Sequence, residues 1–210
     1  MKKIVFIVLF SCCINAAFAQ FAFGVGGTYN TSLGFDEKWN FNSKNLLYGN
    51  DLAQGFGLGL FLRGGNWVFV QPELYYNLMI SNAKIGDEGK SFTITSSTFN
   101  VPVLLGVKAV NLPKFNLRFL VGPRFKFALG KNPPAFFADY EIDATPRKWL
   151  LGLETGFGFD IGIVTIDFRY NLMQDVLHYV SQNEKIELNR SPVNSFSVGL
   201  GFKIVDKRKR

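Results

Sequence analysis

The sequence has few of the side chains on which metal sites and covalent catalysis usually depend. Two cysteines and one histidine occur among its 210 residues. Both cysteines, Cys12 and Cys13, lie close to the N-terminus, and the histidine is His178. Transition-metal sites draw most of their ligands from histidine and cysteine, so we predict no metal, no cofactor and no cysteine nucleophile.

The sequence also lacks a hydrophobic run that could cross a membrane as a helix. A transmembrane helix needs about 20 consecutive apolar residues. The apolar run at residues 4–10 is much shorter, and no later stretch is both long and apolar enough. Because only helices and closed barrels satisfy their backbone hydrogen bonds inside a bilayer, any membrane-spanning part is expected to consist of strands.

The first 19 residues have the layout of a cleaved secretory signal. Lys2 and Lys3 precede the apolar run, and Ala17 and Ala19 supply the small residues of a cleavage site. Residues 9–12 (LFSC) loosely resemble a lipid-attachment box, so a lipoprotein signal is the alternative. Cleavage after Ala19 removes both cysteines, and the mature chain is then expected to have no disulfide.

The composition is rich in aromatic residues and basic overall. Hydrophobic residues make up 48% and aromatics 16%, with 23 phenylalanines and 21 glycines. The formal net charge is +7, or +5 once Lys2 and Lys3 are removed. No basic helix or nucleic-acid motif accompanies this charge, so we predict no nucleic-acid partner. We place the charge inside a barrel, near anionic lipid, or in a basic tail at residues 206–210.

Most of the chain alternates between apolar and polar residues with a period of two, which predicts strands. The clearest segments are residues 54–63, 67–78, 99–108, 115–127, 151–160, 164–171 and 195–204, and residues 20–29 show a weaker version. Each is near the roughly 9–11 residues of a tilted membrane strand. They predict an all-β fold, a closed, eight-stranded, antiparallel, up-and-down transmembrane β-barrel over residues 20–205.

The charged residues in the bodies of these strands all fall on the face that also carries glycine and polar residues. A lipid-facing Arg or Lys at mid-bilayer costs roughly 2–4 kcal/mol, so this face is predicted to point into the lumen. Charges buried there need opposite charges as partners. The predicted lumen-facing network, structural rather than catalytic, comprises Arg63, Glu73, Lys108, Arg118, Arg124, Lys126, Glu154, Asp167, Arg169 and Lys203.

Short and long connections alternate strictly along the chain. Residues 64–66, 111–114 and 160–162 are short turns, whereas residues 30–52, 81–91, 129–147 and 174–192 are long polar stretches. This order predicts short periplasmic turns and long outer loops. Aromatic residues of lipid-facing parity next to the long stretches predict an outer aromatic girdle, made of Tyr29, Tyr76, Trp149 and Tyr170.

A soluble lipocalin-like barrel is the main structural alternative. It also has about eight alternating strands behind a signal peptide, with the apolar face turned inward around a ligand. Its outer face is here dominated by glycine with scattered charge, which is poor cover for a soluble protein. Alternation alone does not separate the two folds, but the composition favours a barrel in the bacterial outer membrane.

Five motifs carry a family resemblance: residues 99–105 (FNVPVLL), 121–125 (VGPRF), 152–158 (GLETGFG), 166–170 (IDFRY) and 197–202 (SVGLGF). They resemble the outer-membrane β-barrel domain family common in Bacteroidota, the group of PorT-like and OmpX-like small barrels. The resemblance covers nearly the whole mature chain and implies an eight-stranded outer-membrane barrel without a catalytic residue. The acidic, Trp-containing N-terminal segment associated with PorT proper is not seen, so only the fold and the location are carried over.

No catalytic site is predicted from the residues. His178 has Ser181 and Glu184 nearby in sequence, but proximity within one loop does not make a catalytic triad. The leading hypothesis is a non-enzymatic outer-membrane barrel with a structural or interaction role, whose long loops contact partners. The alternatives are an accessory subunit of an outer-membrane secretion or assembly complex, a lipid-modifying barrel enzyme and a soluble ligand-binding barrel. The expected partners are outer-membrane lipid and lipopolysaccharide, together with a larger outer-membrane protein complex.

Overall fold

The computed structural model describes residues 21–32, 37–41, 44–48, 54–85, 90–129, 142–145, 149–173, 176–181, 185–189 and 193–207. The predicted signal peptide at residues 1–19 and residues 208–210 of the predicted basic tail lie outside the described residues. No helix in the described part is long and apolar enough to cross a membrane.

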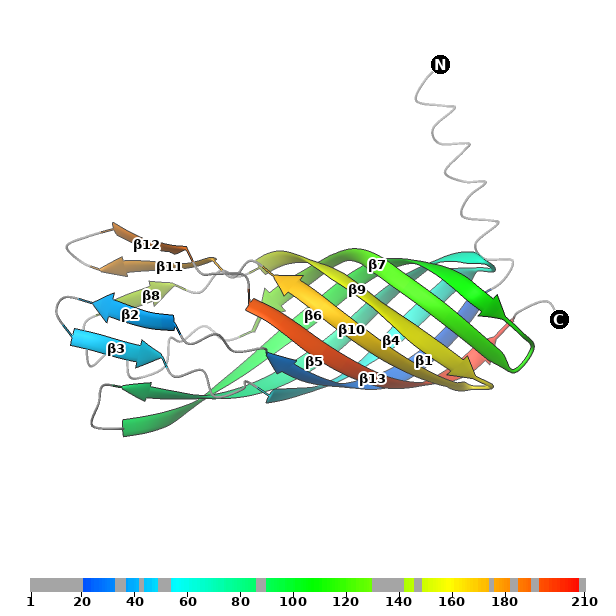
Figure 1. Ribbon diagram of the computed structural model, residues 1–210, viewed down its shortest axis with the longest axis horizontal. Coiled ribbons are helices and arrows are strands. Elements are labelled where there is room, and N and C mark those ends of the chain that lie inside the picture. Colours follow the sequence, from blue (N-terminus) through cyan, green and yellow to red (C-terminus); the bar gives the residue numbers. More distant parts are fainter. Residues whose placement is uncertain are drawn as a thin grey trace, which may run out of the picture.

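Eight long strands close into one barrel (Figure 1). Around the wall they follow the order β1, β13, β10, β9, β7, β6, β5 and β4, and every neighbouring pair is antiparallel. This confirms the predicted closed, eight-stranded, antiparallel barrel. The strands are β1 (Phe21–Ser32), β4 (Gln54–Gly65), β5 (Val68–Ile85), β6 (Lys90–Asn111), β7 (Phe115–Ala128), β9 (Trp149–Ile161), β10 (Val164–Met173) and β13 (Val193–Asp206).

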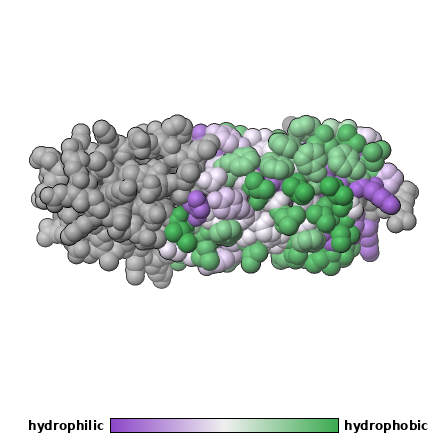
Figure 2. Space-filling model, turned by 60° about the horizontal axis from the view of Figure 1, so that its bottom comes forward, coloured by the Kyte–Doolittle hydropathy of each residue, from purple (hydrophilic) through white to green (hydrophobic). Residues whose placement is uncertain are grey.

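The two faces of the wall differ as the alternation predicted. Successive side chains of a strand point to opposite faces, and in β4 exposed and buried residues alternate over most of the strand. Phe56 and Leu58 are 69% and 74% exposed on the outer face, whereas Phe61 and Arg63 are buried. Figure 2 shows apolar side chains gathered on the wall toward the end that carries the short turns. An outer surface of this kind suits contact with lipid.

Three short turns join the strands at one end of the barrel. They lie between β4 and β5, between β6 and β7, and between β9 and β10. Gly65 and Gly162 adopt positive φ angles of 118° and 59° there, which favours glycine over other residues. The Gly162 N–H donates to the Lys114 carbonyl, so two neighbouring turns are joined. The first and last described residues meet at the same end, where the Lys207 N–H donates to the Phe21 carbonyl.

Five further strands lie in stretches that the sequence analysis assigned to long loops. β2 pairs with β3, and β11 lies between β12 and β8 (Figure 1). Their bounds are β2 (Glu37–Phe41), β3 (Lys44–Tyr48), β8 (Ile142–Thr145), β11 (Val176–Ser181) and β12 (Lys185–Asn189). In Figure 1 they lie beyond the barrel end opposite the short turns.

The stretch at residues 81–91 also differs from the prediction. β5 and β6 continue as a paired hairpin as far as Ile85 and Lys90. The predicted strands ended too early because only the part of a strand that separates lipid from lumen must alternate between apolar and polar residues. Beyond the membrane, no such requirement imposes a period of two on the residues.

Candidate functional site

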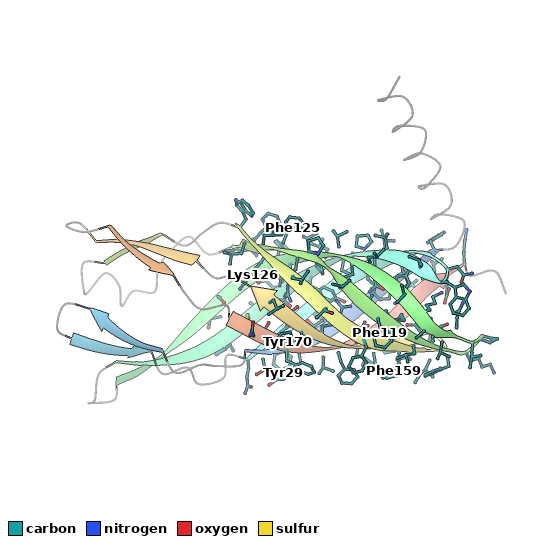
Figure 3. The ribbon with its side chains drawn as sticks, turned by 45° about the horizontal axis from the view of Figure 1, so that its top comes forward. Tyr29, Phe119, Phe125, Lys126, Phe159 and Tyr170 are labelled. Carbon is teal, nitrogen blue, oxygen red and sulfur yellow. The ribbon has the colours of Figure 1, made fainter. Side chains whose placement is uncertain are left out.

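The charged residues lie in the barrel lumen, which is therefore the candidate functional site of the barrel itself. Eight of the ten residues of the predicted network are buried, and Arg118 is 0% exposed. Arg124 and Lys126 are half-buried, and Figure 3 places Lys126 toward the end that lies opposite the short turns. The buried members are Arg63, Glu73, Lys108, Arg118, Glu154, Asp167, Arg169 and Lys203.

One group of charges surrounds Asp160, near the short turns. The Arg63 guanidinium lies 2.6 Å from the Asp160 carboxylate, and the Arg118 guanidinium lies 3.1 Å from it. The Lys203 ammonium lies 3.6 Å from Asp160 and 3.2 Å from Asp206. Asp160 is 0% exposed, yet the predicted network omitted it because it lies where the predicted strand at residues 151–160 meets the predicted turn at residues 160–162. Its parity, shared with Glu154, was the signal that could have identified it.

A second group surrounds Arg169 at mid-strand. Its guanidinium donates to Glu73 at 2.5 and 2.7 Å, to Glu154 at 2.8 Å and to Asp167 at 3.2 Å. The Arg118 guanidinium lies 3.0 Å from Asp167, which joins this group to the first. Hydrogen bonds to ionised partners are the strong ones, so Arg169 holds together strands β5, β9 and β10.

Gln71 is an uncharged bridge between the two groups. Its side-chain oxygen accepts from Arg63 Nε at 2.6 Å and from Arg118 Nη1 at 3.3 Å. Its amide nitrogen donates to Glu73 at 2.5 Å. Gln71 was predicted to lie on the lumen face, but the predicted network contained only charged residues. Gln71 thus adds a second connection to a network that already runs from Lys203 to Arg124, which lies 3.2 Å from Glu154.

Aromatic and aliphatic side chains fill the space beside the ion pairs. Phe69, Leu104 and Leu120 form a buried apolar cluster. A Cβ at Gly106 would lie 2.2 Å from the Phe69 ring, so glycine is needed for the ring to lie against β6. The Phe69 ring centroid is 5.2 Å from the Arg63 guanidinium, a favourable cation–π distance. An eight-stranded barrel has room only for side chains of this kind, so this level of the lumen is a packed plug.

Toward the other end the lumen is lined by amides and hydroxyls. The Asn30 amide donates to Asn77 at 3.3 Å and to the Thr28 hydroxyl at 3.2 Å. Further buried polar residues at this level are Thr98, Asn100, Asn171 and Ser197. These uncharged residues were not predicted as part of the site, because only charge marked the lumen face in the sequence.

The four residues predicted as an outer aromatic girdle lie on the outer face. Trp149 is 59% exposed, Tyr76 39% and Tyr29 37%, whereas Tyr170 is half-buried. The Tyr29 ring lies 5.3 Å from the Phe56 ring, and the Tyr76 ring lies 5.5 Å from the Phe99 ring. Figure 3 shows Tyr29 and Tyr170 on the outside of the wall.

The described side chains assemble no recognisable catalytic group. Each of the carboxylates Glu73, Glu154 and Asp167 is ion-paired with arginine. No cluster of three or more potential metal ligands occurs among the described residues. His178 lies in β11, opposite Glu187 on one side and Thr145 on the other.

The sequence matches the model of one protein family, described as "Outer membrane protein beta-barrel domain", over residues 18–174. No curated protein matches it significantly. Among solved structures, the outer membrane protein OprG of Pseudomonas aeruginosa superposes with a TM-score of 0.56 at 11% identity. That alignment covers 88% of this chain and 95% of OprG, and it supports the fold.

Two further structures align over most of their length with lower scores. Ail of Yersinia pestis, solved with the heparin analogue sucrose octasulfate, has 14% identity and a TM-score of 0.43, covering 88% of this chain and 98% of Ail. Outer Membrane Protein W of Escherichia coli has 13% identity and a TM-score of 0.43, covering 88% and 97%. The family model covers most of the chain, and it places the protein in the outer membrane.

Proposed function

Because this chain belongs to the outer membrane protein β-barrel domain family, we propose that its barrel is a non-enzymatic anchor that presents a strand-built surface outside the membrane to partners. The paired extension of β5 and β6 is the observation that carries this proposal. β4 pairs with β5 only as far as Gln54 and Ile80, and β7 pairs with β6 only as far as Ala128 and Thr98.

The hairpin therefore continues past both neighbouring barrel strands. Residues 81–85 of β5 still pair with β6, and at about 3.4 Å per residue they extend roughly 17 Å along the strand. β3 contacts β5, and the strands β8, β11 and β12 form a separate small sheet. A surface made of paired strands is better ordered for recognition than an irregular loop of the same length.

The filled lumen supports an anchor rather than a diffusion pore. Arg118, Gln71, Phe69 and Leu104 are each at most 1% exposed, and the ion pairs join strands on different sides of the barrel. Breaking such buried pairs is costly, so solutes are not expected to pass through this plug. The carboxylates that could serve as acids or bases are held by arginines, which supports the non-enzymatic assignment.

The expected partner is a protein or polysaccharide outside the membrane, with outer-membrane lipid and lipopolysaccharide around the wall. Within this proposal, the PorT-like resemblance favours a barrel of the kind found in Bacteroidota. An accessory role in a secretion or assembly complex is a special case, in which the partner is a stoichiometric membrane protein.

Purification from the outer membrane in mild detergent tests the proposal. The wild-type barrel is compared with a variant in which residues 82–93 are replaced by a short Gly-Asn-Gly turn. We expect a partner, or binding to surface polysaccharide, to be lost in the variant, while the heat-dependent gel shift of the folded barrel is kept. Altered lipid A mass spectra in a deletion strain, restored by the hairpin variant, would instead support a lipid-modifying enzyme.

A further inference from the structure

Three prolines interrupt one side of the barrel wall. Pro72, Pro102 and Pro123 lie in β5, β6 and β7, which are consecutive strands of the wall. Proline has no N–H to donate to a neighbouring strand, and it is therefore rare in the interior of sheets. Inside a bilayer no water from the lipid side replaces the missing hydrogen bond.

The strand pairing is broken at three successive junctions, and each break contains one of these prolines. Continuing the register across each break places Pro72 opposite Leu62, Pro102 opposite Glu73 and Pro123 opposite Val103. Between β4 and β5, pairing stops at Phe61↔Glu73 and resumes at Gly64↔Val70. Between β5 and β6, it stops at Pro72↔Val103 and resumes at Tyr75↔Asn100. Between β6 and β7, it stops at Pro102↔Arg124 and resumes at Leu105↔Val121.

The other five junctions of the barrel have no such break. Pairing runs without a missing position between β1 and β4, β9 and β10, β10 and β13, and β7 and β9. Between β1 and β13 there is one register shift near Phe23. The interruptions are therefore confined to the part of the wall centred on β5, β6 and β7.

β6 is the strand most affected. Residues 101 and 102 are unpaired toward β5, and residues 103 and 104 are unpaired toward β7. The break between β4 and β5 is crossed by the hydrogen bond from Arg63 to Gln71. Behind the β6 breaks lie Leu104 and Leu120, at 0% and 3% exposure, whose side chains cannot form hydrogen bonds across the junctions.

We propose that residues 101–105 of β6 form a seam at which the barrel wall opens toward the bilayer while the rest of the wall stays closed. Separation at this place breaks fewer hydrogen bonds than elsewhere. It also brings Phe69, Leu104 and Leu120 toward the acyl chains of the lipid, which are apolar like the cluster itself. Opening at β10 would instead bring the ion pairs of Asp167 and Arg169 toward lipid.

Amide hydrogen exchange of the wild-type protein in lipid nanodiscs tests the seam directly. Residues 101–105 are expected to exchange at least about tenfold faster than residues 164–170 of β10, which have unbroken pairing on both sides. Equal rates in the two segments would overturn the proposal.

A variant that restores a backbone hydrogen-bond donor tests whether the missing proline N–H groups cause the seam. Pro123→Val returns an N–H to the β6–β7 junction at a lipid-facing position and is expected to slow exchange in residues 101–105 several-fold. Pro113→Val, in the turn between β6 and β7, is the matched control and is expected to leave the exchange of these residues unchanged. If Pro123→Val leaves the exchange unchanged, or if both variants change it alike, the assignment of the seam to the prolines is wrong.

A lipid-attached maleimide, which reacts from within the bilayer, tests whether the wall opens toward the lipid. The reactive positions are Leu104→Cys behind the seam and Thr165→Cys on β10, both in a background without Cys12 and Cys13. Thr165 is 2% exposed and lies behind continuous pairing. Labelling of the cysteine at 104 and not of the one at 165 supports opening toward lipid, whereas equal labelling or no labelling at 104 overturns it. This measurement remains available if Pro123→Val fails to fold.

Discussion

Replacing Arg169 by methionine is expected to lower the free energy of unfolding by about 3–5 kcal/mol, the usual cost of removing one partner from a buried ion pair. Arg169 contacts the carboxylates of Glu73, Glu154 and Asp167 at 2.5 to 3.2 Å and is 5% exposed. Methionine has a similar length and fills much of the same space, so the effect reports the lost charge rather than a cavity. Glu73 is the most affected partner, because Asp167 keeps Arg118 and Glu154 keeps Arg124.

Arg124→Met is the matched comparison. The Arg124 side chain is 12% exposed and contacts Glu154, which retains Arg169 when Arg124 is lost. Its removal leaves no carboxylate without an arginine, and the expected loss is about 1.5 kcal/mol. The difference between the two losses in free energy of unfolding therefore distinguishes a central position in the network from a peripheral one.

Urea unfolding of the purified barrel in lipid vesicles, followed by the unheated gel mobility, measures both losses. The double variant Arg169→Met with Glu73→Gln is expected to be more stable than the sum of the single losses predicts, by about 0.5–3 kcal/mol, because the carboxylate without a partner is gone. The reasoning is refuted if Arg169→Met costs no more than Arg124→Met, or if the double variant shows simple additivity.

Three further predictions follow from the packed lumen and the apolar wall. Gly106→Val places a side chain against the Phe69 ring and should cost about 1–3 kcal/mol by overpacking; unfolding in urea measures it, and Phe69→Ala in the same chain should recover part of the loss. Leu60→Arg puts a charge on the lipid-facing side of β4, where Leu60 is 44% exposed, and should cost about 2–4 kcal/mol near the bilayer midplane; unchanged folding into vesicles would argue against this orientation of the wall. Proteoliposomes that contain the wild-type barrel should swell in sugar solutions no faster than protein-free liposomes, and fast swelling would contradict the packed plug.

The barrel could be predicted from the sequence because the alternation of apolar and polar residues in each strand indicates which side faces lipid. A charge on the outer face is expensive in hydrocarbon, so Arg118 shares the parity of Gly122 in β7, and Asp167 and Arg169 share the parity of Thr165 and Asn171 in β10. This constraint applies to each strand separately, and no knowledge of its neighbours is needed. The glycine-rich composition of the polar face, rather than the alternation, favoured the membrane barrel over a soluble one.

The remainder of the site depends on neighbours that a single strand does not identify. Asp160 was left out of the network because it stands at a predicted strand end, and strand ends are set by pairing across the barrel. Gln71 was left out because its role comes from Arg63 and Arg118. The seam, too, could not be predicted from single strands. Each proline is visible in the sequence, but the register that brings Pro72, Pro102 and Pro123 to consecutive junctions exists only in the assembled wall.

The pairing of β1 with β13 has a consequence for how the chain reaches its final state. The first and last described strands of the chain are adjacent, with Ala22 opposite Asp206, so the wall cannot close until the last strand has been synthesised and inserted. Until then, β1 and β10 each present an unpaired edge, which is prone to aggregation in water and costly in lipid. A chain that stops before residue 193 retains both edges, so the barrel is expected to depend on its C-terminal strand for insertion as well as for stability.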